Sequence, residues 1–506
     1  MLDLGTTFIA AVEREPGAKA IVDGDVALTY GEWLERISGL AGGLASMGLA
    51  PGDRVAVVLQ NTWQMATLHW ACQLTGLIVT PLNWRVSADE LDYFVANAEA
   101  KAIFFADISA PALNAIAGSA NMPRVSVDGS PGGTHDFDEL MNSKAAPIQS
   151  HAAADDISLM LYTSGTTGPG KGVPRRHRTE RAAALAHVAQ NCYRYGESTL
   201  GVMPLYHTMG VRSLLAMALV QGCFVCLPRF DAALALEWIA RERVSTLYLV
   251  PTLYHDLLAS DAFAGADVSS VRKLGFAGAP MTDGLLQRVE AAFKPELFVN
   301  HYGSSEVYTF TIEQDAVAKP GSAGKAGINQ HIRVVEVGAD DPDTVLASGE
   351  EGEIIASLVS DEAFEGYWRR PEADAKSLKD GWYHTGDMGY FDADGDLFMT
   401  GRVDDMIITG GENVLPVEIE SVLSLHSGVA EIAVAGLEDE RWGKRVTAFI
   451  KRREAVTETE LDSYCRQSDL ANFKRPREYV FVREIPKSPV GKILRRKLIA
   501  GEYERE

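Results

Sequence analysis

The strongest constraint on the fold of this chain is an alternation between short apolar runs and longer segments with helical periodicity. In the first 110 residues, runs rich in Val, Ile, Leu and Phe are separated by stretches long enough for a helix. Strands joined by helices in this way lie parallel in one sheet, with the helices packed on its faces. The predicted strands are 53–61, 77–82 and 101–107, and the predicted helices are 63–74 and 87–98.

The same alternation returns in the middle of the chain. Apolar runs at 244–251, 271–279 and 297–303 are separated by helical segments, one beginning at Thr252 and one spanning 281–293. Repeated units of this kind build α/β domains. The sequence therefore predicts an α/β fold in which a large N-terminal domain contains parallel sheets with crossover helices. Residues 127–156, rich in Gly, Ser, Pro and Asp, are predicted to form a surface connection.

The pattern changes near residue 400. Asp394-Gly395 lies between two runs of alternating apolar residues, which predicts a β-hairpin. After Arg402 come about 100 residues with helix and strand patterns of their own, enough for a small domain. The whole chain of 506 residues is also too long for one core at roughly 150 residues per domain. We expect an N-terminal domain over 1–403 that includes a β subdomain, and a small α+β C-terminal domain over 404–506.

Composition excludes several classes of function. The chain has 47 Lys and Arg against 69 Asp and Glu, and this net charge of −22 would repel a nucleic-acid backbone. The N-terminus lacks the basic and apolar regions of a secretion signal. The longest apolar run, 214–227, is shorter than the roughly 20 residues that span a bilayer. We expect a cytoplasmic protein with no nucleic-acid partner and no membrane span.

Two sequence patterns resemble metal sites without matching them. Cys223 and Cys226 form a CxxC pair in an apolar run with no second pair nearby, which favours buried strand thiols over a metal or redox site. Asp392, Asp394 and Asp396 suggest a calcium loop, but the Gly and Glu that an EF-hand requires are missing. A turn is therefore favoured there.

The segment LMLYTSGTTGPGKGV, residues 159–173, has the composition of a phosphate-binding loop. Its backbone N–H groups, hydroxyls and single lysine suit a polyphosphate. Gly165, Gly170 and Lys171 satisfy the start of a Walker A motif, but Gly172 stands where that motif needs Ser or Thr for Mg²⁺. This mismatch disfavours a P-loop NTPase, and the hydroxyl-rich run is not typical of a flexible linker.

The loop closely resembles the signature loop of adenylate-forming enzymes, which include acyl-CoA and aryl-CoA synthetases, luciferases and peptide-synthetase adenylation domains. Further motifs of that superfamily follow in order along the whole chain. They are MPLYH at 203–207, FAGAP at 276–280, YGSSE at 302–306, YHTGD at 383–387, GRVDDMIITGGENVLPVEIE at 401–420 and PKSPVGKILRRKL at 486–498. With DERWG and FKRP, the set is most similar to aryl-acid CoA ligases of the 4-chlorobenzoate CoA ligase type.

Two positions depart from the family pattern. The loop has GPGKG, so that Pro169 and Gly170 are displaced by one position while Lys171 keeps its spacing. Ser305 stands where the family usually has Thr, which preserves the hydroxyl. The departures concern the path of the loop backbone and leave its implied role intact.

The resemblance implies a reaction in two halves. A carboxylate attacks the α-phosphorus of ATP to give acyl-AMP and pyrophosphate, and the thiol of CoA then displaces AMP. By resemblance, Lys492 bridges carboxylate and α-phosphate, and Glu306 binds Mg²⁺. Lys171 and the loop bind the β and γ phosphates, and Asp387 and Arg402 bind the ribose. The implied ATP and AMP contacts are Thr163, Ser164, Gly165, Thr166, Thr167, Gly168, Lys171, Gly278, Ala279, Pro280, Tyr302, Gly303, Ser304, Ser305, Asp387 and Arg402.

The family also implies a mobile C-terminal domain. Asp404 matches its hinge, about which the domain would rotate between the two half-reactions. The loop at Gly410, Gly411 and Glu412 would then approach for thioester formation. The implied CoA contacts are Arg85, Gly410, Gly411, Trp442, Phe473 and Arg475, whereas Arg175, Arg176 and Arg178 are expected on a solvated face.

His207 resembles a residue of the acid-pocket wall that also gates the half-reactions, and is grouped with Lys492 and Glu306 as catalytic. The implied pocket consists of Ala186, His207, Met209, Tyr248, His301, Gly303, Tyr308 and Thr309. Because Tyr248, His301 and Tyr308 can hydrogen-bond a ring oxygen or hydroxyl, a small aromatic or heteroaromatic acid such as hydroxybenzoate or furoate is the leading hypothesis.

Three alternatives stay open. They are transfer of the acyl group to a carrier protein, a medium-chain acyl-CoA synthetase, and a phosphate-loop NTPase. The oligomeric state stays open as well, with a homodimer among the options.

Overall fold

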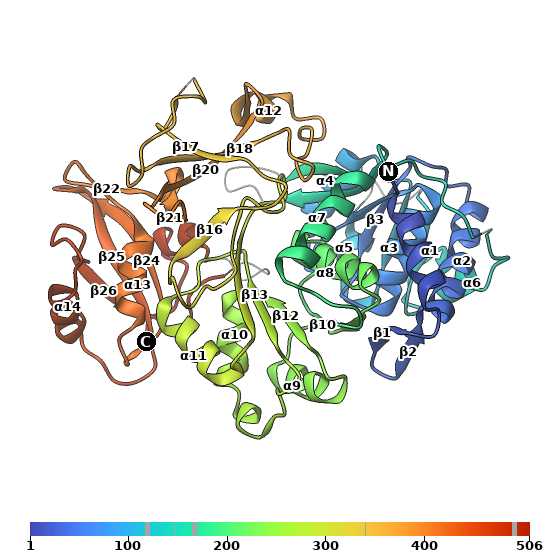
Figure 1. The fold of residues 1–506 in the computed structure, drawn as a ribbon, viewed down its shortest axis with the longest axis horizontal. Coiled ribbons are helices and arrows are strands. Elements are labelled where there is room, and N and C mark those ends of the chain that lie inside the picture. Colours follow the sequence, from blue (N-terminus) through green and yellow to red (C-terminus); the bar gives the residue numbers. More distant parts are fainter. Residues whose placement is uncertain (117–121, 147, 164–169, 340, 488–492) are drawn as a thin grey trace.

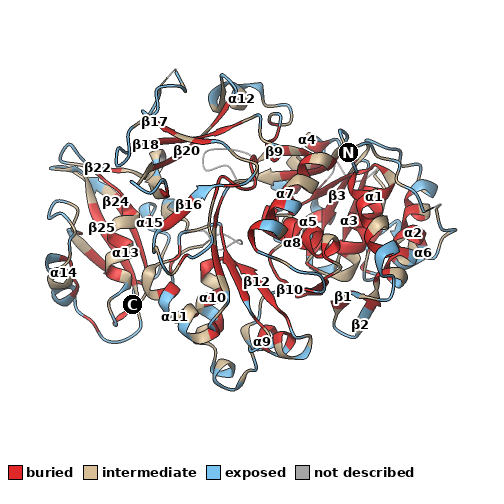
Figure 2. Cartoon of the chain, in the orientation of Figure 1, coloured by how far each residue is buried: buried red, intermediate tan, exposed pale blue. Residues whose placement is uncertain are grey.

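The computed structural model describes the chain except residues 117–121, 147, 164–169, 340 and 488–492, and the side chains of Asp404 and Asn413. The chain progresses across the molecule from the N-terminal part on one side to the C-terminal domain on the other (Figure 1). Buried residues concentrate in the strands and on the helix faces that cover them (Figure 2).

The first sheet confirms the predicted strands of the N-terminal part. Its order is β7-β6-β5-β3-β4-β8-β9, parallel except for the antiparallel pair β8 and β9. Thr62 caps α3, and Ser87 forms a capping box with Glu90 at α4. The strands are β3 (Arg54–Val58), β4 (Ile78–Pro81), β5 (Ala102–Phe105), β6 (Arg124–Ser126), β7 (His135–Asp136), β8 (Ile157–Thr163) and β9 (Lys171–Arg176), and the helices of this part are α1 (Leu4–Arg14), α2 (Tyr30–Ser46), α3 (Trp63–Thr75), α4 (Ala88–Ala98), α5 (Ala110–Ala115) and α6 (Phe137–Met141).

The second sheet begins with a parallel half. Strands β1, β11, β10, β12, β13 and β14 pair in parallel, and β2 closes the edge antiparallel to β1. This half confirms the strands predicted between residues 244 and 303. The strands are β1 (Lys19–Asp23), β2 (Val26–Thr29), β10 (Ser198–Gly201), β11 (Cys223–Cys226), β12 (Thr246–Leu249), β13 (Lys273–Phe276) and β14 (Leu297–Tyr302), and the helices are α7 (His177–Gln190), α8 (Thr208–Leu219), α9 (Ala232–Arg241), α10 (Pro251–Ala259) and α11 (Asp283–Phe293).

The same sheet continues into the predicted β subdomain. From β14 onward every pairing is antiparallel, in the order β14-β15-β16-β21-β20-β18-β17. The parallel body and the subdomain therefore share one continuous sheet. The elements are β15 (Thr311–Glu313), β16 (Ser322–Ala326), β17 (Ile332–Val335), β18 (Gly352–Ser357), α12 (Pro371–Ser377), β19 (Leu378–Lys379), β20 (Trp382–Phe391) and β21 (Leu397–Arg402).

The hairpin predicted at Asp394-Gly395 joins β20 to β21, and Gly395 has the positive φ of 79° that the turn requires. The carboxylates of Asp392, Asp394 and Asp396 lie within 4.8 Å of one another. The amine of Lys319 forms ion pairs with all three. Lys325 also pairs with Asp396, at 2.9 Å, so two lysines offset part of the charge of this acidic turn.

The C-terminal domain has a sheet and a core of its own. Its sheet order is β23-β22-β25-β24, with β26 parallel to β25. Ile419 and Leu423 on α13, the helix that begins at Pro416, are buried in this core. The expected boundary at 403/404 falls in the short turn Val403–Asp405 and stays a prediction. The elements are β22 (Ile407–Thr409), β23 (Glu412–Val414), α13 (Pro416–Ser424), β24 (Val429–Asp439), β25 (Gly443–Arg452), α14 (Glu458–Gln467), β26 (Glu478–Phe481) and α15 (Arg495–Ile499).

One sequence expectation needs correction. The segment 127–156 is not merely a surface connection, because it contains β7 and α6. Asp136 caps α6 by accepting from the backbone N–H groups of Asp138 and Glu139. Phe137 is fully buried and packs its ring against Trp63. Two apolar side chains one helical turn apart, Phe137 and Leu140, were enough to anchor this helix amid turn-forming residues.

The structure also describes the two CxxC cysteines and the helices that a membrane span would require. Cys223 and Cys226 are buried, unpaired thiols in β11, and burial raises the pKa of Cys223 to about 12. Among the described residues, no helix combines the length and the apolar character needed to cross a membrane.

Candidate functional site

Three predicted nucleotide contacts come together where the ends of β14 and β21 meet the middle of β20. Asp387 and Arg402 face each other across the β20–β21 pair and form an ion pair of 2.9 Å. The hydroxyl of Tyr302, at the end of β14, donates to Asp387 Oδ2 at 2.7 Å. One carboxylate is thus oriented by a cation and a phenol that come from different parts of the sheet. Burial, together with the Asp387 charge, raises the pKa of Tyr302, so the phenol stays protonated as the donor.

Glu306 and Lys171 form a second polar group, and the Lys171 ammonium is close enough to Arg402 to feel its charge. Glu306 is buried, and Tyr367 donates to its Oε1 at 2.7 Å. The ammonium of Lys171 lies 3.9 Å from the centroid of the same Tyr367 ring. Burial lowers the pKa of Lys171, and the Glu306 charge opposes this shift. Tyr367 is therefore the shared neighbour of the predicted metal carboxylate and the predicted phosphate cation. It lies outside the sequence motifs.

Lys171 begins β9 directly opposite Thr163, the last residue of β8. The two antiparallel strands therefore hold the ends of the predicted phosphate loop. Ser164, Gly165, Thr166, Thr167 and Gly168 lie outside the described residues, as does Lys492.

The FAGAP segment begins with the last residue of the buried strand β13, Phe276, and becomes an exposed turn from Gly278 onward. Gly278 has a φ of +83°, which only glycine adopts readily. A Cβ there would lie 3.9 Å from the sulfur of Met209, so this turn adjoins the predicted acid pocket. Ala279 and Pro280 are partly or fully exposed, as are Gly303, Ser304 and Ser305 after β14. A residue with a side chain is excluded at position 303, because its Cβ would lie 2.1 Å from the Tyr308 carbonyl oxygen.

His207 is the N-cap of α8. Its Nδ1 accepts from the backbone N–H of Met209 at 3.3 Å, and the side chain is half-buried. The cap fixes the imidazole at the start of the helix that also carries Met209. His207 is therefore held two residues before Met209, whose sulfur adjoins the FAGAP turn.

The remaining predicted acid-pocket residues meet in the interior and are nearly inaccessible. The rings of Tyr248 and His301 lie 5.1 Å apart. Thr309 accepts from Arg212 Nη1 at 2.7 Å, and the Tyr248 hydroxyl accepts from Arg212 Nη2 at 2.6 Å. The hydroxyl of Tyr308 donates to Glu180 at 3.0 Å. The buried members are Ala186, Met209, Tyr248, His301, Tyr308 and Thr309.

Several buried residues of this group were not expected from the sequence. Arg175, predicted on a solvated face, is fully buried and pairs with Glu180 at 2.7 Å. The prediction was wrong because β9 turns Arg175 inward, while Arg176 and Arg178 pair at the surface with Glu365. Arg212 is a lone charge within the apolar helix α8, and this is the signal that could have identified it.

The predicted CoA contacts fall into separate places. Gly410 packs on Trp442, since a Cβ would lie 2.8 Å from the indole, and its N–H donates to the Trp442 carbonyl at 2.8 Å. Gly411 is exposed with a φ of +87°. Phe473 is 40% exposed, whereas Arg475 pairs with Asp462. Arg85 stacks on Trp84 with 3.7 Å between guanidinium and ring.

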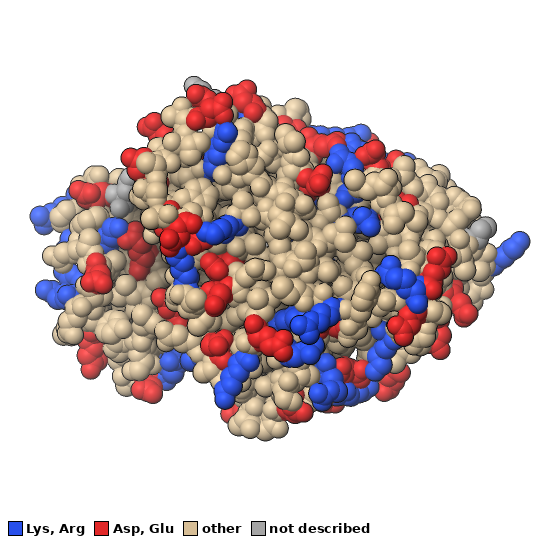
Figure 3. Space-filling model, viewed as in Figure 1, with Lys and Arg blue, Asp and Glu red and all other residues tan. Residues whose placement is uncertain are grey.

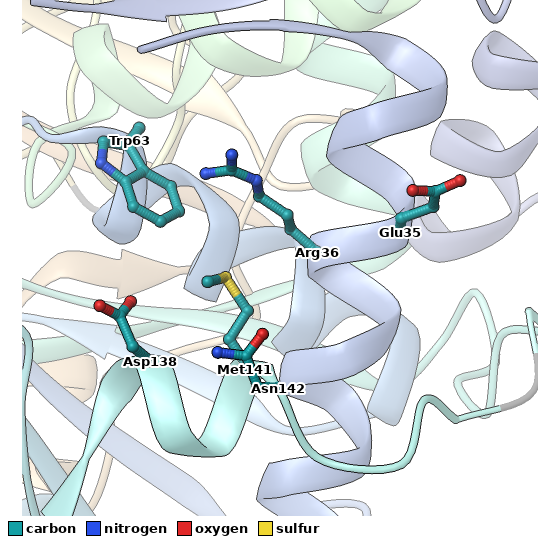
Figure 4. A pocket seen from close by; sticks show the side chains of 6 residues that line it. All are labelled: Glu35, Arg36, Trp63, Asp138, Met141 and Asn142. Carbon is teal, nitrogen blue, oxygen red and sulfur yellow. The ribbon is translucent and has the colours of Figure 1, made fainter. Parts of the chain in front are cut away.

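Basic and acidic side chains are interspersed on the face of the molecule in Figure 3. The surface also has a crevice that is separate from the predicted site residues. A crevice of about 490 Å³ lies where α2, α3 and α6 meet (Figure 4). Arg36 extends toward Trp63, with 4.9 Å between guanidinium and ring. None of the predicted site residues is among its lining side chains, which are Glu35, Arg36, Trp63, Asp138, Met141 and Asn142.

Comparison with known proteins bears on this arrangement. The family model for AMP-binding enzymes matches residues 8–368, and the model for the C-terminal domain of AMP-binding enzymes matches residues 418–492. A 4-chlorobenzoate–CoA ligase of Arthrobacter sp is 34% identical over 96% of this chain and 93% of its own length. The long-chain-fatty-acid–CoA ligase FadD13 of Mycobacterium tuberculosis is 33% identical over 93% of this chain and 92% of its own.

The solved structures agree. The crystal structure of the anthranilate CoA ligase AuaEII in complex with anthranoyl-AMP superposes with a TM-score of 0.91 at 26% identity, covering 99% of this chain and 97% of that one. The resemblance seen in the sequence motifs is confirmed, and so is the fold class of a large α/β domain followed by a small separate domain. The chain belongs to the AMP-binding enzyme family.

Proposed function

We propose that this protein is an AMP-forming ligase that joins a small aromatic or heteroaromatic acid to CoA. The observation that carries the proposal is the presence of two polar groups, Asp387–Arg402–Tyr302 and Glu306–Lys171, in a member of the family that matches a CoA ligase over 96% of this chain. The first group offers an acceptor and a donor to vicinal hydroxyls, and the second offers a cation to phosphates. Together the two groups complement the ribose hydroxyls and the phosphates of ATP.

In the first half-reaction, the carboxylate of the acid attacks the α-phosphorus, forming an acyl–O–P bond and releasing pyrophosphate. Both reactants are anionic, so fixed cations supply most of the catalysis. Lys171 would hold the terminal phosphates with Thr163 and the loop at 164–168. Lys492 would reach the α-phosphate and the carboxylate. Gly278, Ala279 and Pro280 would lie along the adenine, and Ser304 and Ser305 would line the phosphate path.

Magnesium fits this site through Glu306. Mg²⁺ is usually held by one or two carboxylates together with phosphate oxygens. Tyr367 binds Oε1 of Glu306, which fixes the orientation of the carboxylate beside Lys171. When bound, Mg²⁺ would screen the charge of the pyrophosphate that leaves.

In the second half-reaction, the thiolate of CoA attacks the acyl carbon and AMP departs. We place the hinge at Asp404, which would let the C-terminal domain bring Gly410 and Gly411 toward the acyl-AMP. Trp442 and Phe473 would contact CoA, with Arg85 and Arg475 near its phosphates. The existing ion pair of Arg475 with Asp462 must then be exchanged for a phosphate contact. We place the activity in the cytoplasm, and propose a homodimer as a hypothesis for the native assembly.

The acid is proposed to be aromatic because its pocket residues combine flat rings with hydrogen-bonding groups. His207 would separate the adenylate from the interior, where Met209, Tyr248 and His301 lie. The relatives named above act, by their names, on a chlorinated benzoate, a long-chain fatty acid and anthranilate. Two of these three acids are aromatic, which supports the proposal.

The test is a substrate panel followed by mass spectrometry. The protein is incubated with Mg²⁺-ATP, CoA and, separately, benzoate, hydroxybenzoates, furoate, cyclohexanecarboxylate and fatty acids. AMP and an acyl-CoA formed in equal amounts with a ring-sized acid are expected. AMP without a thioester would point to a carrier protein as acceptor, a fatty acid as best substrate would overturn the aromatic assignment, and acid-independent ADP would overturn the ligase.

A further inference from the structure

The interior beside the predicted acid pocket contains several buried polar atoms without partners among the described residues. Arg212 Nε, His187 Nε2 and His301 Nδ1 have no hydrogen-bond partner. Each side chain is at most 2% exposed. A buried polar atom left unpaired costs about 1–3 kcal/mol, so three such atoms on neighbouring side chains require an explanation.

These side chains surround one aromatic residue. The ring of Tyr248 lies 4.8 Å from the ring of His187 and 5.1 Å from that of His301, and the Arg212 guanidinium lies 5.3 Å from its centroid. A Cβ on Gly275 would lie 2.9 Å from Tyr248, so glycine at that position makes room for the ring. The three unpaired atoms therefore belong to one cluster centred on Tyr248.

Asn191 links the two histidines of the cluster. Its Nδ2 donates to the His187 carbonyl at 2.8 Å and lies 3.0 Å from His187 Nδ1. His301 Nε2 lies 3.1 Å from Asn191 Nδ2 and 3.2 Å from Asn191 Oδ1. One ring nitrogen of each histidine is therefore held by Asn191, and the other, His187 Nε2 or His301 Nδ1, is left unpaired and donates or accepts according to the tautomer.

Both histidines are neutral at pH 7. Burial lowers the pKa of His187 and of His301 well below the ordinary value of 6.5, and the charge of Arg212 adds to both shifts. The unpaired atoms around Tyr248 are therefore one fixed donor, Arg212 Nε, and one nitrogen on each of two neutral imidazoles, which can donate or accept. A hydroxyl group, which accepts and donates, complements these atoms in either tautomer, whereas a C–H or a halogen does not.

Charge balance excludes a second carboxylate as the complement. Arg175 pairs with Glu180, and Arg212 interacts with Glu362, whose Oε1 accepts from Asn329 at 3.1 Å. Two cations and two carboxylates thus balance in the interior around the Tyr248 cluster. A further buried anion would remain uncompensated, at a cost far larger than that of a neutral hydroxyl.

We propose that Arg212, His187 and His301 make this enzyme selective for carboxylic acids that carry a hydroxyl group remote from the reacting carboxylate. The inference rests on the proposed function, because it concerns the acid of the same site. Tyr308 is not part of the selective set, since its hydroxyl is already directed to Glu180. Tyr248 accepts from Arg212 and fixes the guanidinium toward the cluster.

The test compares matched acids and matched variants. Rates of acid-dependent ATP–pyrophosphate exchange give kcat/KM for 3-hydroxybenzoate, 4-hydroxybenzoate, benzoate and 4-chlorobenzoate. The wild-type protein should prefer the better hydroxy acid over benzoate by roughly tenfold or more, because an acid without the hydroxyl leaves the buried groups unpaired. His301→Leu and Arg212→Met should lower this ratio toward one.

His69→Leu is the control. His69 is also buried with an unpaired Nε2, but it lies on α3 and is not part of the Tyr248 cluster. The selectivity ratio of this variant should equal that of the wild type. If Arg212→Met fails to fold, His301→Leu carries the test.

The outcomes separate the two claims. If the acids are activated but hydroxy acids and benzoate react equally, or the ratio survives His301→Leu, the selectivity inference is overturned and the ligase proposal stands. If no acid of the wider panel supports exchange, the ligase proposal fails and the inference fails with it.

Discussion

The two ends of the candidate site are built on opposite principles. At the nucleotide end, Asp387 and Arg402 pair across two strands, and the Arg402 side chain is still 46% exposed. At the acid end, Arg175 and Glu180 pair with both side chains fully buried, next to Tyr308. The nucleotide end leaves the Arg402 cation accessible to a ligand while its carboxylates are buried, and the acid end encloses both members of its ion pair.

Because the two ion pairs differ in burial, removing one partner should cost a different amount of folding stability in each. An exposed pair contributes about 1 kcal/mol or less to stability, whereas removing one partner of a buried pair costs about 3–5 kcal/mol. Side chains at the nucleotide end should therefore matter for activity more than for folding. The enclosed charges beyond the acid pocket should show the reverse.

The largest effect is expected at the buried end. Arg175→Met should lower the free energy of unfolding by about 3–5 kcal/mol, because Glu180 loses its cation in the interior. Chemical denaturation measures this. The double variant Arg175→Met with Glu180→Gln should recover part of the loss. A single variant as stable as the wild type would contradict the enclosed-charge account.

Glu306→Gln should reduce acid-dependent ATP–pyrophosphate exchange by about 10²–10³-fold, as expected when a charge that acts in the transition state is removed. The melting temperature should change little, since the amide keeps the contact with Tyr367. Tyr367→Phe is the matched control and should cost less, because it removes only the hydrogen bond that orients the carboxylate. Equal activities of Glu306→Gln and wild type would remove Glu306 from the site.

Arg402→Met should raise the KM for ATP by roughly tenfold, the effect of one lost charged hydrogen bond. Its free energy of unfolding should stay within about 1 kcal/mol of the wild type, because the pair with Asp387 is partly exposed. Steady-state kinetics and denaturation on the same preparation compare the two values. A large loss of stability with an unchanged KM would reverse the contrast drawn here.

The smallest effect concerns pH. The pKa values of His187 and His301 lie well below 6.5 in the folded protein, so the unfolded chain binds more protons below that pH. Their contribution to stability is complete above about pH 6.5 and declines as the pH falls. His301→Leu should therefore lose less unfolding free energy between pH 7.5 and 5.5 than the wild type. An equal or larger loss in the variant would contradict the neutral, buried state.

The sequence predicted the nucleotide end better than the acid end for a physical reason. ATP binding depends on short runs such as YGSSE and YHTGD, in which backbone turns and one or two side chains act together, so local sequence carries the signal. Tyr367 was missed because it reaches Glu306 from a loop 61 residues away. No local pattern records such a contact.

At the acid end, the network depends on residues brought together by tertiary packing. Arg212, His187 and Asn191 sit on helices or their ends at ordinary core positions, and their partners come from β12 and β14. Periodicity alone predicted the strands β3, β4, β5, β12, β13 and β14 and the helices α3, α4, α10 and α11. The exception at α6 arose because two buried side chains outweighed a turn-rich composition.

Adenylation of an acid followed by transfer of its acyl group to CoA can be traced with an isotope. A hydroxybenzoate labelled with ¹⁸O in both carboxylate oxygens is supplied with Mg²⁺-ATP and CoA, and the products are analysed by mass spectrometry. Because the carboxylate oxygen that bonds to the α-phosphorus leaves with it, the account predicts AMP carrying one ¹⁸O atom and an acyl-CoA carrying the other. Unlabelled AMP, or ADP as the only nucleotide product, would contradict it.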